Sequence, residues 1–424
     1  MRFGLRREHA GEAGLRPAAK RAARRQRVAK MKILVSNIGS TSFKFRLFDI
    51  SASEGQLAAG GADRIGGEGG ACEWSVAGGE AKRVDRDFAD HGEAITFVLE
   101  RLVADGALAE TGELDAVAFK AVMGGDCPAV ALVNDALLER MGYFIPVAPA
   151  HNPPYIAAMR MFRKVLGETP LVAAFEPGFH GTNPPRRRFY ACPPQWAEDY
   201  GVKRYGFHGA SHRYIATRMR ELMPEARSVI SCHLGGSSSL CAIRDGESVA
   251  TSMGLSPQSG LPQGSRVGDF DPYGLKLMAA ETGRELDDLL GELGSKAGLA
   301  SLSGTGGDMR DIERGAAEGD ERCRLAIDIY VTAIRDYLGA YLVELGGAEA
   351  IAFTGGIGQR SPLVRGRVLE GLEFAGIVMD AAANEEMTDE GRIDAADSTT
   401  AVWVLPTNEE LIVARQAAEL LKRK

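Results

Sequence analysis

The chain has 424 residues, of which 45% are hydrophobic and 25% charged, and its formal net charge at pH 7 is −7. This composition is typical of a globular protein and argues against a disordered or fibrous chain. The acidic balance gives no global sign of nucleic-acid binding, and no apolar run reaches the roughly 18 residues that a membrane-spanning helix requires. We therefore expect neither nucleic acid nor a membrane as a partner, and residues 31–424 are long enough for two domains.

The cysteines form no C-x-x-C pair, which argues against a structural zinc site or a redox-active pair. In a chain of this length they are typical of reduced core residues in a cytoplasmic protein. We therefore expect a cytoplasmic location, and core positions without disulfides for Cys72, Cys127, Cys192, Cys232, Cys241 and Cys323.

Residues 1–30 differ from the rest of the chain, because basic side chains greatly outnumber acidic ones there. The segment has no apolar stretch of the kind found in secretory signals. Basic tails also occur where a protein binds nucleic acid or a membrane surface, so this function stays open. We favour a disordered extension, or a misassigned start with Met31 as the true initiator.

The segment Lys32–Ile50 has the pattern of an apolar strand, a polar turn and a second apolar strand. In the turn, residues 39–42, Gly39 is followed by three hydroxyl side chains, and Lys44 comes shortly after. A turn of small residues lets backbone N–H groups approach an anion closely, and hydroxyls and a lysine add donors. The pattern indicates a β-hairpin that binds phosphate, although an ordinary serine-rich hairpin turn fits the composition equally well. It is not a Walker loop, because the G-x-x-x-x-G-K spacing and the following helix are missing.

A second segment, Ser228–Gly246, repeats this plan of apolar strand, glycine and serine turn, and apolar strand. Its residues 236–239 correspond to residues 39–42 of the first segment. Two such hairpins, each followed by a mixed α/β stretch, indicate a duplicated domain with a nucleotide bound between the halves. The plan resembles that of the actin, Hsp70 and sugar-kinase superfamily. We therefore expect an α/β fold of two duplicated RNase H-like domains around an interdomain cleft.

The chain resembles the acetate kinase family through motifs that follow the family's order from Met31 to the C-terminus. The most specific are YGFHGASH, GSRVGDFDP and PTNEEL, and Met31-Lys32-Ile33 begins as the family's chains begin. The resemblance implies a phosphotransferase that uses ATP and a carboxylate. The other matching segments are VSNIGSTSFKF, VAPAHNPP, SCHLGGSSS, SGTGGDMRD and FTGGIG.

The resemblance also implies the domain boundaries. We expect an N-terminal domain over residues 31–178, joined by a returning C-terminal helix at 410–424, and a nucleotide-binding domain over residues 179–409. Within them, His91–Gly106 and Leu325–Leu345 carry apolar residues at helical spacing, which predicts helices packed on the core.

Lys120 stands where the family has the arginine that binds the substrate carboxylate. It keeps the positive charge but loses the planar fork that holds a carboxylate through two hydrogen bonds. Ala150 replaces a leucine of the family's acyl pocket, and because one methylene is worth about 1–3 kcal/mol of discrimination, this change favours an acid larger than acetate. The substrate-binding residues that the resemblance implies are Lys120, Val122, Ala150, His151, Phe207 and Pro257.

Three residues are expected at the catalytic centre. Glu176 replaces the family's aspartate and adds one methylene, which looks linked to the shorter cation at Lys120, unless both changes are drift in a weakened relative. The resemblance assigns His208 and Arg266 to the transferring phosphoryl group, where a guanidinium neutralises charge as it spreads over the equatorial oxygens. His208 and His212 are four positions apart, a spacing that also occurs in metal sites, but no third metal ligand lies near them in the sequence. His212 is therefore expected to be structural.

The nucleotide is expected to bind the two hairpins and two further loops. Asp308–Arg310 matches a nucleotide-contacting segment of the family, and Ile351–Gly358 predicts a strand, a glycine turn and a helix suited to adenosine. Gln359 replaces the family's glutamate, which leaves the nucleotide preference open. The expected nucleotide-binding residues are Ser40, Ser42, Lys44, His233, Leu234, Gly235, Gly236, Ser237, Asp308, Met309, Arg310, Gly355, Gly356, Ile357, Gly358 and Gln359.

The resemblance implies a magnesium ion bound by Asn37 and Glu409, with manganese as an alternative, and ATP as the co-substrate. Mg²⁺ commonly keeps waters and phosphate oxygens and takes only one or two protein ligands, so a short ligand set is reasonable. Glu409 also suits the acidic first turn of a helix, so a purely structural role is the alternative.

Three functions remain in competition. The first is an acetate or propionate kinase, the second a kinase of the same fold with a changed acyl acceptor or phosphoryl partner, and the third a catalytically weak nucleotide-binding protein. Asn37, Lys44, His208, Arg266 and Glu409 are retained, which argues against the third. The expected partners are a small carboxylate, with acetate as the first candidate, and ATP or ADP. A homodimer is also expected, because members of the family commonly form homodimers. The sequence leaves open the carboxylate, the phosphoryl donor, the direction of transfer and the oligomeric state.

Overall fold

The computed structural model describes residues 31–51 and 54–423. The basic segment 1–30, with its expected disorder or misassigned start, lies outside the described residues. In the described part, no helix combines the length and the apolar composition needed to cross a membrane.

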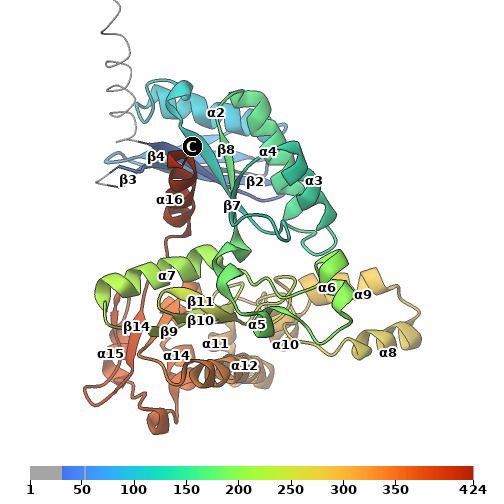
Figure 1. Ribbon diagram of the computed structural model, residues 1–424, viewed down its shortest axis with the longest axis vertical. Helices are drawn as coiled ribbons and strands as arrows, with labels where there is room; N and C mark the ends of the chain where they lie inside the picture. The colour runs from blue at the N-terminus through green and yellow to red at the C-terminus, as the bar shows by residue number, and fades with distance from the viewer. Residues whose placement is uncertain (1–30, 52–53, 424) are drawn as a thin grey trace, which may run out of the picture. The chain divides into compact units, whose positions relative to one another are not determined.

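The chain divides into two compact units, and each has its own β-sheet (Figure 1). The domain boundary expected between residues 178 and 179 stays a prediction. In the structure, unit 1 comprises the described residues up to Phe119, with Ala158–Val172 and the residues from Ala414 onward, and unit 2 comprises Lys120–Ala157 and Ala173–Val413.

Strands β1 and β2 form the hairpin expected at the start of the fold, and β1 also pairs in parallel with β6. Along β2, Phe43, Phe45 and Leu47 are buried and alternate with exposed or half-buried Lys44 and Arg46, which is the period-two pattern of a strand with one covered face. The strands of this sheet, in spatial order, are β5 (Lys82–Asp85), β4 (Ala71–Val76), β3 (Gly55–Asp63), β2 (Ser42–Asp49), β1 (Lys32–Ile38), β6 (Ala116–Ala121), β8 (Leu171–Phe175) and β7 (Val130–Leu132).

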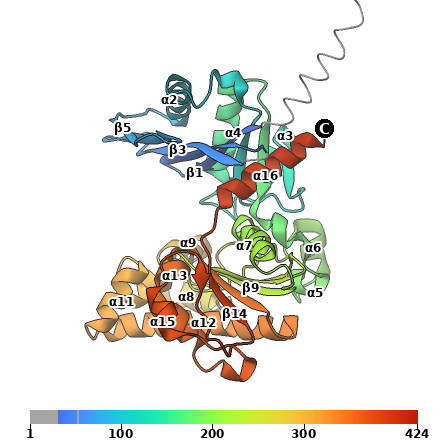
Figure 2. The ribbon, with the colours of Figure 1, turned by 90° about the vertical axis from the view of Figure 1, so that its left-hand side faces the viewer.

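Helices cover both faces of this sheet. Helix α2 (His91–Ala104) begins at Asp90, whose side chain accepts the Glu93 backbone N–H, and it buries Ile95, Val98, Leu99 and Leu102, as the helical spacing predicted. Figure 2 shows α2 and α4 (Asn152–Leu166) on one face of the sheet and α16 (Glu409–Lys422) on the other.

The second sheet repeats the plan of the first. An antiparallel hairpin, β9 and β10, is followed by a strand, β12, that pairs in parallel with β9, as β6 pairs with β1. The predicted α/β fold with a duplicated sheet plan is confirmed. The spatial order is β11 (Glu247–Thr251), β10 (Ser239–Arg244), β9 (Ser228–His233), β12 (Ala350–Thr354), β14 (Ala401–Val404) and β13 (Gly391–Arg392).

Two helices cover the two faces of this sheet. Helix α7 (Gly209–Leu222) packs on the face that carries Val229 and Ile243, and α12 (Glu321–Leu345) packs on the face that carries Ile230. The long apolar helix predicted at Leu325–Leu345 is confirmed and begins one turn earlier. The other helices are α3 (Asp135–Tyr143), α5 (Pro185–Arg188), α6 (Pro194–Tyr200), α8 (Tyr273–Thr282), α9 (Leu286–Ser295), α10 (Gly298–Ser303), α11 (Met309–Ala317), α13 (Gly355–Arg360), α14 (Pro362–Leu369) and α15 (Ala381–Glu386).

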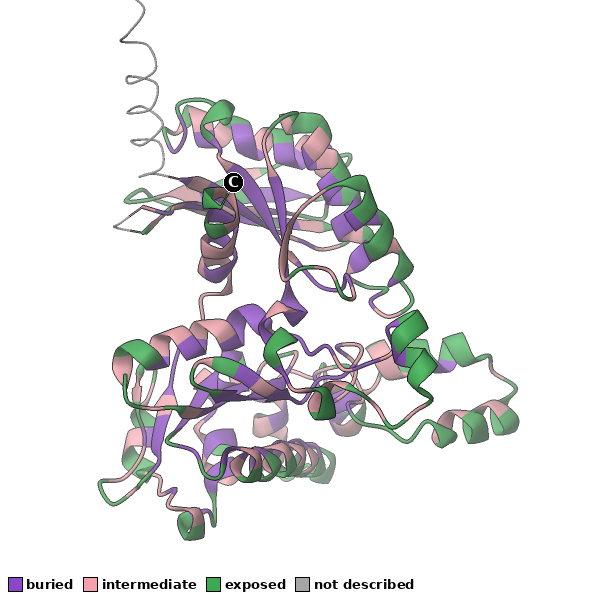
Figure 3. Cartoon of the chain, viewed as in Figure 1, coloured by how far each residue is buried: buried purple, intermediate pink, exposed green. Residues whose placement is uncertain are grey.

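Polar side chains are unusually buried where α7 meets the hairpin β9–β10. Ser211, His212, Ser231 and Ser239 are completely inaccessible to solvent, although the buried positions of the two sheets, which Figure 3 colours purple, are otherwise mainly apolar. Buried polar groups require hydrogen-bond partners, so this region of unit 2 is a candidate for function.

All six cysteines are free thiols. Four are buried, as predicted, but Cys127 and Cys192 are only half-buried, so the predicted core position is wrong for these two. Both lie in loops rather than in strands or helices, where backbone polar groups keep the chain near solvent.

Candidate active site

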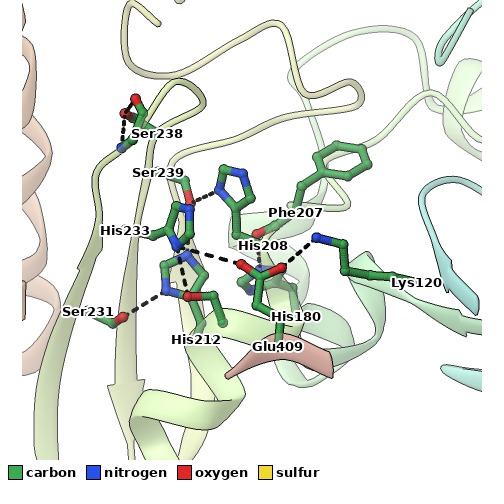
Figure 4. Close-up of polar contacts among 12 residues, drawn as sticks. Lys120, His180, Phe207, His208, His212, Ser231, His233, Ser238, Ser239 and Glu409 are labelled. Carbon is green, nitrogen blue, oxygen red and sulfur yellow. Dashed lines mark hydrogen bonds and ion pairs between the residues drawn. The ribbon is translucent and has the colours of Figure 1, made fainter. Parts of the chain in front are cut away.

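Lys120 and Glu409 form an ion pair although 289 positions separate them, with 2.5 Å between Lys120 Nζ and Glu409 Oε2. Lys120 lies on β6 and Glu409 opens α16, and Figure 4 shows the ammonium group directed at the carboxylate. Burial alone would lower the pKa of Lys120, but the negative charges of Glu409 and Glu176 outweigh it and raise that pKa. Burial would likewise raise the pKa of Glu409, but Lys120 holds it below its usual range. Both groups are therefore charged at neutral pH.

Glu176 follows β8 and lies at the N-terminus of α7, where its carboxylate accepts the backbone N–H groups of His208 and Gly209. A side chain at Gly209 would place Cβ only 1.9 Å from the Glu176 carbonyl oxygen, so only glycine permits this close approach. Burial is the main cause that raises the pKa of Glu176 to about 7, and the charge of Glu409 adds to it. In the described part of the chain, Glu176 Oε1 is buried and has no hydrogen-bond partner. This oxygen is available to a ligand.

His208 has a strained backbone, with φ of 56°, in the left-handed region that residues with a side chain rarely adopt. Three contacts hold it there: Glu176 accepts its N–H, its carbonyl accepts the His212 N–H, and His180 Nε2–H donates to the preceding carbonyl of Phe207 at 2.9 Å. Sequence analysis assigned no role to His180. The strain fixes the direction of the His208 side chain.

A chain of hydrogen bonds leads from His208 into the core (Figure 4). His208 Nδ1 lies 2.9 Å from Ser239 Oγ, which lies 2.8 Å from His212 Nε2, and His212 Nδ1 lies 2.9 Å from Ser231 Oγ. Burial is the first cause that holds the pKa values of both histidines well below the usual range, and neighbouring imidazoles add to it. His208 is therefore neutral at pH 7, and this chain determines which ring nitrogen carries its proton.

His233 stacks on His208, with ring centroids 4.3 Å apart and planes inclined by 29°. Its Nδ1 is hydrogen-bonded to Ser211 Oγ at 2.8 Å and lies 4.0 Å from Glu409 Oε1. The sequence placed His233 with the nucleotide hairpin, and the structure places it between the proposed phosphoryl-binding histidine and the proposed metal ligand.

Arg266 lies close to these groups and has no carboxylate partner in the described part of the chain. Its NH1 donates to Gln263 Oε1 at 3.0 Å, to Ser237 Oγ at 3.2 Å and to the Pro257 carbonyl at 3.4 Å. Burial lowers its pKa. His151 lies near the same charge: burial first, then Arg266 and Lys120, lower the pKa of His151 to about 4. The cationic end of the site is thus preassembled for an anion.

Of the residues expected around the acyl group, two lie in a buried apolar cluster, and Pro257 and Ala150 lie outside this cluster. Val122 and Phe207 belong to the cluster. Its other buried members, which the sequence did not identify as site residues, are Met123, Phe144, Ala148, Tyr205 and Met253. Pro257 is buried, and its carbonyl faces Gln263 and Arg266, whereas Ala150 is exposed.

The expected nucleotide loops of unit 2 meet at the second hairpin. The Leu234 carbonyl accepts the N–H groups of Ile357 and Gly358, and Gly236 accepts the Gly264 N–H. A side chain at Gly355, whose φ is +78°, would place Cβ 2.5 Å from the Leu234 carbonyl oxygen. These contacts bring the loop 355–359 beside residues 234–237.

Asp308, Met309 and Arg310 open helix α11 next to Gly307, which packs against Gly264. The Asp308 side chain caps the helix and accepts Arg310 Nε–H at 3.0 Å. These two exposed side chains pair with each other. Their place at the helix cap is a structural role that stands beside the expected nucleotide contact.

The first hairpin belongs to unit 1. Asn37 is half-buried and lies opposite Lys44 in the register of β1 and β2, and the side chains of Ser40 and Lys44 are exposed. Ser42 opens β2 as Ser239 opens β10, so the correspondence of residues 39–42 with 236–239 agrees with the strand bounds.

The profile of the Acetokinase family matches residues 32–415. The acetate kinase of Clostridium botulinum strain Langeland is 40% identical over 396 residues, which cover 92% of this chain and 99% of the relative. The crystal structure of Porphyromonas gingivalis acetate kinase superposes with a TM-score of 0.83 at 33% identity, covering 92% of this chain and all of that one. A propionate kinase from Francisella tularensis superposes with a TM-score of 0.84 at 29% identity, covering 91% of this chain and 98% of that one.

Proposed function

Because the chain belongs to the acetate kinase family, we propose that it transfers the γ-phosphoryl group of ATP reversibly to a short-chain carboxylate, with acetate as the first candidate. The products are an acyl phosphate and ADP. The observation that carries the proposal is the cluster in unit 2 of an unneutralised guanidinium, Arg266, a paired ammonium, Lys120, and a neutral imidazole, His208.

A carboxylate acceptor needs no general base, because it is already ionised at pH 7. Catalysis then consists of positioning the two anions and neutralising charge as it develops. In this proposal Lys120 and His151 hold the carboxylate, and the apolar cluster around Val122 and Phe207 receives its alkyl group.

Arg266 and His208 act on the transferring group. The guanidinium offers N–H donors that no carboxylate of the described chain neutralises. A neutral His208 donates one hydrogen bond through the ring nitrogen opposite Ser239, provided that Ser239 donates to Nδ1. Glu176 holds His208 in place by accepting backbone N–H groups at the N-terminus of α7, and its carboxyl group also faces Lys120.

The donor set suits a magnesium ion that is bound mainly through phosphate oxygens. In the described residues there is no group of three or more histidine, cysteine or acidic side chains that could hold a metal. Glu409 offers carboxylate oxygens, the donor type that Mg²⁺ prefers, and its Oε1 lies 4.0 Å from His233, beyond hydrogen-bond distance. Glu409 is therefore the proposed magnesium ligand in unit 2, and Asn37 and the manganese alternative stay predictions. When bound, the metal neutralises phosphate charge.

One observation favours a second candidate, a propionate kinase or a kinase of a larger acid. Ala150 replaces the family's leucine and is exposed, so it fills less space than that leucine would. The similarity to the Francisella propionate kinase agrees with this alternative. The homodimer and the cytoplasmic location also stay proposals, and sedimentation of the purified protein tests the first.

The test is hydroxamate trapping of the acyl phosphate with ATP and Mg²⁺ across formate, acetate, propionate, butyrate and hydroxy acids. A maximum at acetate supports the first candidate, and a maximum at propionate or a larger acid supports the second. Tight ATP binding without acyl phosphate from any acid overturns both and leaves the nucleotide-binding protein.

A double variant tests whether Lys120 and Glu176 are adapted to a particular acid or are neutral changes. Lys120→Arg with Glu176→Asp restores the family's residues. A gain of acetate activity means that the native pair serves another acid, and a loss means that the native pair is adapted to acetate.

A further inference from the structure

Gln263 is a completely buried polar residue that sequence analysis did not assign to the site. It lies in the loop between β11 and α8, three residues before Arg266. Its side-chain amide contacts three residues. Oε1 accepts Ser237 Oγ–H at 2.6 Å and Arg266 NH1–H at 3.0 Å, and Nε2–H donates to the Pro257 carbonyl at 2.8 Å. One amide therefore joins the phosphate hairpin, the guanidinium and the expected acyl pocket.

The orientation of this amide follows from its neighbours. A guanidinium can only donate and a carbonyl can only accept, so Oε1 must face Arg266 and Nε2 must face Pro257. The backbone adds two bonds: Gln263 N–H donates to the Arg266 carbonyl at 3.0 Å, and its own carbonyl accepts the Leu299 N–H at 2.9 Å. Side chain and backbone together leave Arg266 NH1 little freedom.

We propose that Gln263 is a positioning residue that holds the Arg266 guanidinium at the phosphate hairpin without neutralising it. The proposal rests on the proposed function, in which Arg266 acts on the transferring phosphoryl group. An amide oxygen carries only a partial negative charge, so it orients the guanidinium and leaves its full charge for the phosphoryl oxygens. A carboxylate at the same place would pair with Arg266 and compete with the substrate.

This assignment also explains the buried contacts of Ser237. Its hydroxyl accepts from Arg266 and donates to Gln263, so the three side chains form a closed triangle. The triangle therefore links phosphate binding at the second hairpin to the position of the Arg266 guanidinium. The further bond from Gln263 to the Pro257 carbonyl links both to the expected acyl pocket.

The experiment compares Gln263→Glu and Gln263→Met with wild type for kcat, for the KM of ATP and for the affinity of MgADP. Gln263→Glu keeps the size of the side chain but places a carboxylate against Arg266. We expect kcat to fall about a hundredfold or more in this variant, because misplacement of a reacting group by about 1 Å has an effect of that size. The affinity for MgADP should change little, whereas the midpoint of thermal unfolding should fall in Gln263→Glu and in Gln263→Met, because both variants lose the donor to the Pro257 carbonyl. Gln263→Met should lower kcat about tenfold, and Ser237→Ala should lower it less.

Gln258→Glu is the matched control, because it introduces a carboxylate into the same loop at a half-buried residue outside the triangle. We expect its kcat to stay within about twofold of wild type. A second control is the background Arg266→Ala, in which adding Gln263→Glu should lower kcat by less than about twofold. A purely structural role would lower kcat by the same factor in both backgrounds.

An unchanged kcat in Gln263→Glu overturns the inference, and so does a loss of kcat that is equally large in Gln263→Met or that is matched by a loss of MgADP affinity. Failure of the proposed function looks different: wild type itself then makes no acyl phosphate. In that case crystal structures of wild type and Gln263→Glu still decide the inference. Arg266 in the same place in both contradicts it, and a guanidinium drawn from Ser237 onto the new carboxylate supports it.

Discussion

The two hairpins share a sequence plan and differ in how their turns are held. In the first, residues 39–41 join β1 to β2, and the side chains of Ser40 and Thr41 are exposed. Other segments bind only the backbone of this turn in the described structure: His91 Nε2–H donates to the Gly39 carbonyl at 3.1 Å, and the Ile65 N–H donates to the Thr41 carbonyl at 2.9 Å. In the second, residues 234–238 join β9 to β10, and Ser238 is completely buried and hydrogen-bonded to the Tyr330 hydroxyl at 2.8 Å. A glycine and serine turn therefore does not determine by itself how rigid a phosphate site is.

The difference arises from the segments that surround each turn within its own unit. Around the second turn, Leu234 binds the loop 355–359, Gly236 binds Gly264, and Ser237 binds Gln263. A site whose donors are already ordered loses less conformational entropy when it binds an anion. In the proposed function, the donors of the second hairpin are therefore preorganised for a phosphate group.

The largest contrast should come from the cations beside the two turns. Arg266→Ala should lower kcat about a thousandfold, because the guanidinium acts on charge that develops in the transition state. Lys44→Ala, beside the exposed turn, should mainly raise the KM of ATP and lower kcat less than tenfold. Hydroxamate assays at varied ATP concentration measure both values. Equal losses of kcat in the two variants would contradict the contrast.

Glycine replacement tests the same contrast through stability. Gly355→Ala should lower the free energy of unfolding of unit 2 by roughly 3–4 kcal/mol, because φ is positive and the new Cβ meets backbone atoms of Leu234. At Gly39 the new Cβ meets the Ser42 hydroxyl at 2.6 Å, and that side chain can turn away, so Gly39→Ala should cost less than about 1 kcal/mol. Urea unfolding followed by circular dichroism distinguishes the two. A larger effect at Gly39 would contradict the difference in packing.

Acid should destabilise unit 2 selectively. Burial lowers the pKa of His180 to about 4, from an ordinary value of 6.5. The unfolded chain therefore takes up the proton first as the pH falls, so the stability that is present above pH 6.5 is lost progressively towards pH 4. For His180 alone the loss is about 3 kcal/mol.

Tryptophan fluorescence separates the units in this measurement, because Trp74 lies in unit 1 and Trp403 in unit 2. The control is His180→Gln, whose side-chain N–H can still donate to the Phe207 carbonyl but does not titrate. A slope between pH 6.5 and 4 that is the same in this variant would exclude His180 as the cause.

The smallest effects come from single hydroxyls. Ser238→Ala should lower the free energy of unfolding by about 2 kcal/mol, because it removes the buried partner of the Tyr330 hydroxyl. Ser40→Ala, on the exposed turn, should change it by less than about 0.5 kcal/mol. Thermal unfolding of both variants checks the pair, and a cost at Ser40 as large as at Ser238 would contradict the difference in side-chain burial between the two turns.

Much of the site could be predicted from the sequence, because motif residues are close together along the chain. His208 and Arg266 lie within long specific motifs, and the two hairpins follow from alternation of apolar residues around a polar turn. Gln263, His180 and Ser239 could not be assigned roles in the same way. Each acts on a residue of another segment, and nothing in a residue's own neighbourhood in sequence reveals such a partner.

By itself, then, the sequence determined the family and the α/β fold with its repeated hairpin plan, since local periodicity and motif spacing depend on residues a few positions apart. The tertiary structure decided which of these groups are paired and which are available. Lys120 binds Glu409 across 289 positions, whereas Arg266 binds only neutral oxygens among the described residues. The physical reason is that the charge state and orientation of a buried side chain are set by its neighbours in space, and folding alone brings those neighbours together.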